Sequence, residues 1–199
     1  MISSRILPLE TNPGFIIMTQ KQKAIHGILP SRFSECKEIQ NCSISKKIML
    51  TIIWDTRGLL YMEFVTKGLM VNSDRYCATL RSLKQRIHRI RPERSAFLSH
   101  HDNARPHCGA QTQDAMTSLK FTMVPHPPYS QDLAPSDSWL FPKLEEMLKG
   151  QHFSSDAEVE AAVHKWISSQ PETFFMDRMN KWISWLKKSV AVNGNYVEK

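Results

Sequence analysis

The stretch from Phe97 to Phe141 constrains this chain more than any other, because it carries two aspartates in two different local settings. Asp102 follows the apolar run 96–98, which predicts a buried strand. Asp137 follows a Pro-Ser pair and precedes the apolar run 139–141, which predicts the start of a helix. Thirty-four residues lie between the two aspartates, enough for a strand end and a first helical turn to converge in space.

Two converging carboxylates predict a site for a divalent cation. Mg²⁺ binds one or two carboxylates together with phosphate oxygens of a substrate. Two such ions can hold the attacking and the leaving oxygen of a phosphodiester. Asp102 and Asp137 are therefore candidate catalytic residues and candidate ligands of Mg²⁺ or Mn²⁺.

The composition favours an anionic partner over a membrane. The net charge is +7 and the isoelectric point is about 9.3, which suits nucleic acid but also an ordinary basic protein. No apolar run approaches the length of a membrane span, and the N-terminus does not resemble a signal peptide. The four cysteines have no CxxC spacing, and no glycine-rich phosphate loop is present, so we expect free thiols and no small-molecule cofactor.

The order of predicted elements is that of an α/β fold. Apolar periodicity and turn residues predict a short strand at 15–18, further strands at 48–54, 59–65, 96–99 and 121–124, and helices at 73–91, 106–120, 137–149, 157–169 and 171–192. Residues 21–45 are polar and weakly periodic, so we expect a loop there. In the helix 106–120 we expect Ala110, Met116 and Leu119 to face inward. Asp55 opens the turn between the first long strands, and turn formation is its expected role.

The helix 73–91 carries a basic stripe beside its apolar face. The stripe consists of Arg81, Lys84, His88 and Arg91, which recur at helical spacing. It is either a face that contacts nucleic-acid phosphates or an ordinary solvated helix surface.

Two motifs carry a family resemblance. FLSHHDNARPH (97–107) and PHPPYSQDLAPSDSWLF (125–141), supported by WDTRG, VNSDRYC and the terminal NGNYVEK, resemble the mariner group of DNA transposases. The resemblance implies an RNase H-like domain over residues 46–199, with a mixed sheet and flanking helices, that cleaves DNA and transfers strands in the nucleus. We expect residues 1–45 to be an atypical, poorly ordered N-terminal segment, without the helix-turn-helix region of such transposases.

The chain departs from this family at the first of its three metal-binding aspartates. That aspartate lies in a Gly-Asp-Glu motif on the leading strand of the domain, which we therefore expect to be missing or degenerate here. Counting back from Asp102 by the family spacing reaches Glu10, and no aspartate precedes Asp55. Glu10 is thus the candidate replacement ligand, a two-ion site is not expected to form well, and cleavage should be impaired.

Other polar residues near the two aspartates are candidates for supporting roles. Asn103, His107 and Ser136 could hold the site, Ser136 by capping the helix that follows it. His100, His101 and His107 leave zinc as an alternative, although their spacing matches no finger pattern.

Three hypotheses follow for the whole chain. The first is an impaired, N-terminally truncated transposase catalytic domain. The second is a non-catalytic nucleic-acid-binding or dimerising module derived from a transposase, for which a homodimer is compatible with the sequence. The third is a relic without function.

Overall fold

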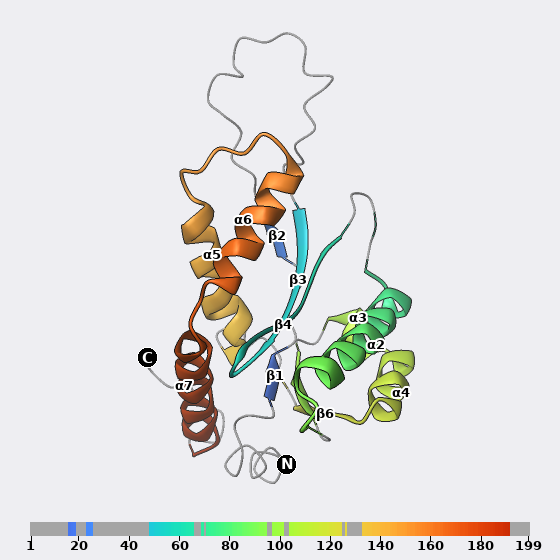
Figure 1. Cartoon of the computed structure of the whole chain (residues 1–199). Helices are drawn as coiled ribbons and strands as arrows, with labels where there is room; N and C mark the ends of the chain where they lie inside the picture. Colours follow the sequence, from blue (N-terminus) through green and yellow to red (C-terminus); the bar gives the residue numbers. More distant parts are fainter. Residues whose placement is uncertain are drawn as a thin grey trace.

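The computed structural model describes residues 16–18, 23–25, 48–65, 69, 71–94, 97–101, 104–124, 126 and 133–191. Within them, six strands form one mixed sheet (Figure 1). The strands are β1 (Ile16–Met18), β2 (Lys23–Ile25), β3 (Ile48–Asp55), β4 (Gly58–Val65), β5 (Phe97–His100) and β6 (Phe121–Val124). β3 pairs with β4 on one edge and with both β1 and β2 on the other, while β5 joins β1 to β6.

The leading strand of the sheet is present, in two short pieces. β1 lies between β3 and β5, antiparallel to the first and parallel to the second. β2 continues along the same strand, because Met18 faces Trp54 of β3 and Lys23 faces Leu50. The strand predicted at 15–18 is confirmed, whereas the predicted loop is wrong at 23–25. At least these six residues of the segment 1–45 belong to the sheet, and the rest of that segment lies outside the described residues.

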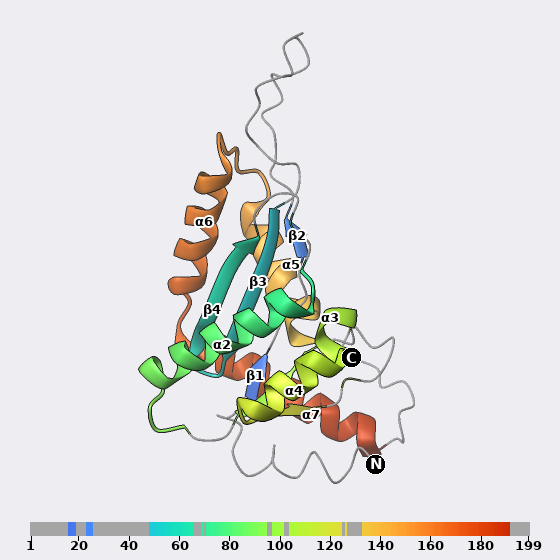
Figure 2. The ribbon, with the colours of Figure 1, turned by 90° about the vertical axis from the view of Figure 1, so that its right-hand side faces the viewer.

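Helices cover both faces of the sheet (Figures 1 and 2). On one face lie α2 (Ser73–Ile90), α3 (Arg105–Cys108) and α4 (Ala110–Ser118), and on the other lie α5 (Phe141–Leu148), α6 (Asp156–Ser168) and α7 (Glu172–Ala191). The alternation along β3 explains the two layers: Ile52 and Trp54 join the core under α5 to α7, whereas Ile53 joins the core under α2 and α4. No helix in the described part is long and apolar enough to cross a bilayer.

The hairpin turn between β3 and β4 has the predicted aspartate chemistry. The backbone N–H of Arg57 donates to Oδ1 of Asp55 at 2.8 Å. Gly58 follows with a φ of +124°, a conformation that glycine adopts without strain. The interpretation of Asp55 as a turn residue is therefore confirmed.

The predicted helix 106–120 is divided in two at Gly109. This residue has extended backbone angles, and a Cβ there would lie 3.2 Å from Ser73 Oγ at the start of α2. Ala110, the first residue after the break, is exposed, so its expected inward position is wrong, while Met116 is buried and Leu119 is half-buried as expected.

Candidate functional site

Asp137 lies in a single π-helical turn, η5 (Ser136–Leu140), that leads directly into α5. Its side chain is half-buried, whereas its neighbour Ser136 is buried. The indole Nε1–H of Trp54 donates to Ser136 Oγ at 3.0 Å. The expected capping role of Ser136 is wrong, because η5 has no side-chain cap; Ser136 instead binds this turn to β3 of the sheet.

Two further hydrogen bonds hold this turn and the residues just before it to α7. The indole Nε1–H of Trp182 donates to the carbonyl oxygen of Leu133 at 2.7 Å. Arg178 Nη2 donates to Ser138 Oγ at 2.8 Å, and that hydroxyl donates in turn to the Ala134 carbonyl at 2.9 Å. Asp137 is thus placed between two serines that are each bound to a different layer of the fold.

The strand register brings the end of β5 into the same region. Met18 of β1 faces both Trp54 of β3 and His100 of β5. The His100 ring lies edge-on against Trp182, with ring centroids 4.9 Å apart. Asp102, the other predicted catalytic residue, comes two residues after the last residue of β5. Asp102 and Asn103 lie outside the described residues, as does Glu10.

The histidines near the end of β5 pack against one another and against α2. His100 Nε2 and His126 Nδ1 are 3.2 Å apart, within hydrogen-bond distance. His107 is buried and stacks on Tyr76, with centroids 4.2 Å apart, and its ring also contacts His101. Within the described residues, no three His, Cys, Asp or Glu side chains form a group that could hold a metal ion.

The leading strand carries no carboxylate at the level of β5. The residues of β1 are Ile16, Ile17 and Met18, and the stretch 19–22 that joins β1 to β2 reads Thr-Gln-Lys-Gln. Since β1 is parallel to β5, both strands run toward the same edge of the sheet.

The four residues of the basic stripe predicted on α2 differ in their exposure and in their contacts. Arg81 and His88 are exposed. Lys84 Nζ lies 4.0 Å from the centre of the Phe97 ring, and burial, followed by the charge of Lys120, lowers the pKa of this lysine. Arg91 is half-buried, with its Nε 3.4 Å from Asp55 Oδ2.

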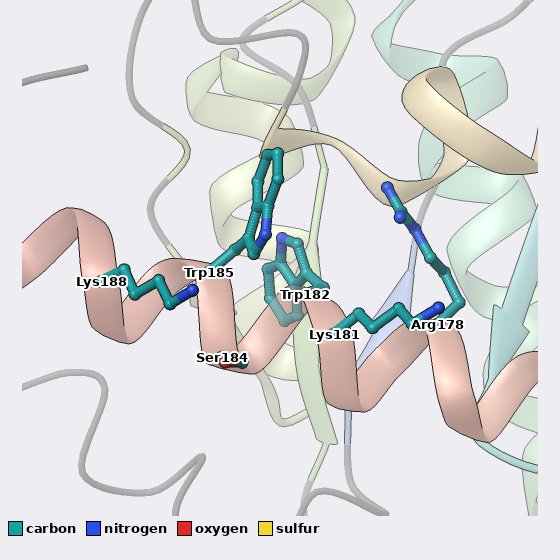
Figure 3. Close-up of a pocket in the computed structure, with 6 residues that line it drawn as sticks. All are labelled: Arg178, Lys181, Trp182, Ser184, Trp185 and Lys188. Atoms are coloured by element: carbon teal, nitrogen blue, oxygen red, sulfur yellow. The ribbon is translucent and has the colours of Figure 1, made fainter. Parts of the chain in front are cut away.

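Further basic side chains, outside the predicted stripe, line two cavities. Arg86 and Arg89 of α2 line a cavity with His164 of α6. A second cavity, of about 260 Å³, lies along α7 and is lined by Arg178, Lys181, Trp182, Ser184, Trp185 and Lys188 (Figure 3). The spacing of 178, 181, 185 and 188 along one helix face is the sequence signal that could have identified this groove.

The fold is that of an RNase H-like domain. Its sheet has β1 at the centre, an antiparallel hairpin on one side and the parallel strands β5 and β6 on the other, and helices cover both faces. Residues 35–97 match the family described as "Transposase (partial DDE domain)". The structure superposes on the crystal structure of the catalytic domain of Mos1 mariner transposase with a TM-score of 0.82 and 28% identity, covering 99% of this chain and 92% of that one.

Two curated proteins are similar in sequence. The Mariner Mos1 transposase of Drosophila mauritiana is 35% identical over 159 residues, covering 77% of this chain and 46% of that protein. The histone-lysine N-methyltransferase SETMAR of Homo sapiens is 33% identical over 156 residues, covering 77% of this chain and 23% of that protein. The chain thus spans less than half the length of either relative. It belongs to the mariner family and corresponds to the catalytic domain of its transposases.

Proposed function

We propose that this chain is a DNA-binding, transposase-derived catalytic domain whose strand cleavage is impaired. The observation that carries the proposal is the placement of Asp137 between two anchored serines, at the end of the sheet toward which β5 leads. A structure of the Mos1 transposase paired-end complex with the left transposon end, and structures of the Mos1 catalytic domain with Mn or Mg, support DNA and a divalent metal as partners.

Asp137 and Asp102 are the proposed ligands of one Mg²⁺ or Mn²⁺ ion. Their carboxylate oxygens suit a hard cation, which would supply electrostatic stabilisation of a phosphodiester undergoing attack. The protein's own contribution at Asp137 is rigidity, because Trp54 and Arg178 fix the turn on both sides of it. Asn103 and His107 are proposed to support the segment after β5, His107 through its stacking on Tyr76.

Impairment follows from the composition of the leading strand. In this family the first aspartate lies on that strand, and here neither β1 nor the stretch 19–22 contains an acid. Met18 of β1 pairs with His100 of the parallel strand β5, and residues 19–22 follow Met18 in the chain as Asp102 follows His100. We therefore propose that the third ligand is lacking at residues 19–22 and that Glu10 is not its replacement. Two carboxylates hold a second ion poorly, so we propose that a two-ion site does not form.

A non-catalytic nucleic-acid-binding module is the second candidate. The net charge of +7 and the cationic groove on α7 favour it, since neither needs a metal. A nuclear location and a homodimer are proposed for either candidate, by relation to transposases that act on DNA.

Metal binding tests the proposed site directly. The electron-paramagnetic-resonance signal of free Mn²⁺, titrated with the full chain, should show one weakly bound ion. Asp137→Asn should abolish that binding, whereas the matched control Asp114→Asn, an exposed aspartate on α4, should not. Binding that is unchanged in Asp137→Asn would overturn the metal assignment and favour the module without chemistry.

A further inference from the structure

We infer that the groove along α7 binds the backbone of a DNA strand next to the Asp137 turn, with Trp185 as a stacking surface for an unpaired base. The inference rests on the proposed DNA partner and adds the surface that holds it. Figure 3 shows the two indoles and the Arg178 side chain on one side of α7, with the two lysines reaching along the helix.

The groove is cationic over its whole length. Arg178, Lys181 and Lys188 line it, and no described carboxylate does. The sequence from 178 to 191 contains four basic residues and no acidic one; the acids of α7, Glu172 and Asp177, both precede it. A surface of this charge attracts phosphate groups.

The cations are not explained by the helix dipole alone. Basic residues near a helix C-terminus offset the partial negative charge of its last carbonyls, within about one turn. Lys188 is in the last turn of α7 and fits that explanation. Arg178 and Lys181 lie in the first half of the helix, where the dipole gives them no such advantage.

The groove is physically continuous with the Asp137 turn. Arg178 binds Ser138, the residue after Asp137, and its guanidinium carbon lies 5.9 Å from the centre of the Trp139 ring. Trp182, at the floor of the groove, is buried and binds Leu133. Because α7 contacts the segment that carries Asp137 directly, a strand whose phosphodiester reaches Asp137 can continue along the groove on α7.

The spacing of the lining residues suits an extended strand. Residues 178, 181, 185 and 188 lie on one helix face and span about 15 Å at a rise of 1.5 Å per residue. Several consecutive phosphates fit along that length. Trp185 is half-exposed among them, and an exposed aromatic face between cations is typical of proteins that bind unpaired bases.

Fluorescence anisotropy with labelled DNA tests the groove. The probes are a single-stranded oligonucleotide and a blunt duplex of equal length, each titrated with the full chain at several salt concentrations. The double variant Lys181→Gln/Lys188→Gln should bind the single strand more weakly. The slope of log affinity against log salt concentration should become less steep by about 1.4, at ~0.7 for each lost phosphate contact. The matched control Lys149→Gln/Lys165→Gln removes two exposed lysines elsewhere and should bind like the unmodified chain.

Substitution of Trp185 separates stacking from charge. Trp185→Ala should weaken single-strand binding about tenfold while leaving duplex binding and the salt slope unchanged, and Trp185→Phe should restore most of the affinity. Circular dichroism confirms that each variant is folded. If the unmodified chain binds neither probe, the DNA partner itself is wrong. If it binds DNA and both pairs of lysine substitutions have equal effects, only the groove is wrong.

Discussion

Asp55 and Asp137 are both connected to Trp54, Asp55 as the next residue in the chain and Asp137 through its neighbour Ser136, but the two aspartates differ in their burial. Asp55 follows Trp54 in the chain, is fully buried, and accepts hydrogen bonds from Arg94 at 3.0 Å and from the backbone of Arg57. Asp137 is half-buried and is positioned by bonds that its neighbours make, through Ser136 and Ser138. A fully buried carboxylate that pairs with arginines stabilises the fold, whereas a half-buried carboxylate on an anchored turn has an exposed part that can contact a ligand.

Loss of the Asp55 carboxylate should have the largest effect on stability. Asp55→Ala leaves the buried Arg94 without its carboxylate and should lower the free energy of unfolding by about 3–5 kcal/mol. Burial already lowers the pKa of Arg94, against the opposing effect of Asp55. Asp137→Ala should cost under about 1 kcal/mol in the same urea titration, as for a part-exposed group. Equal losses would remove the distinction between the two aspartates.

Trp54 links the two aspartates, so its substitution should affect both regions. Trp54→Phe removes the donor to Ser136 and part of the packing against Trp139 and Phe175, and should lower the free energy of unfolding by about 2 kcal/mol. Trp166→Phe, at a half-buried position on α6, is the control and should cost less. Urea unfolding followed by circular dichroism measures both. A loss no greater than that of the control would mean that the indole bond contributes nothing.

A carboxylate introduced between β1 and β2 should supply the metal ligand that the leading strand lacks. Gln20→Asp and Lys21→Asp are made as separate variants. One of the two should raise the Mn²⁺ affinity about tenfold, or ~1.4 kcal/mol. Gln85→Asp, at an exposed position on α2, adds the same single negative charge as Gln20→Asp and should leave the affinity unchanged. If neither substitution at 19–22 differs from Gln85→Asp, the register argument is wrong.

The smallest effect should come from Ser138. Ser138→Ala removes the acceptor of Arg178 and should lower the free energy of unfolding by about 0.5–1 kcal/mol. Mn²⁺ affinity should fall with it, because Asp137 would lose one of its two flanking constraints. Ser168→Ala, near the end of α6, is the control. An unchanged Mn²⁺ affinity would show that the bond between Arg178 and Ser138 is not needed to position Asp137.

The sequence predicted the elements whose signals are local. The β3–β4 hairpin, α2, α6 and α7 follow from apolar periodicity and from caps such as Asn72 and Ser155, which accept the backbone hydrogens of Arg75 and Glu158. β2 was missed because Lys-Ala-Ile is short and becomes a strand only by pairing with β3. The break at Gly109 was missed because it depends on close approach to α2.

The same distinction between local signals and long-range partners applies to the candidate site. The motif predicts Asp137 as a site residue, but it did not predict the hydrogen bond of Ser136, because its partner Trp54 lies 82 residues away in the chain. The role of the α2 stripe stays a prediction, and helical spacing alone does not show that Lys84 lies over the Phe97 ring or that Arg91 lies beside Asp55. Long-range partners, rather than local pattern, decide which charged residues remain available.

Nicking of supercoiled plasmid in Mg²⁺ and in Mn²⁺ tests the central claim most directly, with the unmodified chain compared with Asp137→Asn and Asp102→Asn. The proposed impairment predicts that the folded, DNA-binding chain nicks no faster than either variant in both metals. Rapid metal-dependent nicking that disappears in Asp137→Asn would contradict the account, because it would require a complete metal site and a third ligand that the leading strand does not supply.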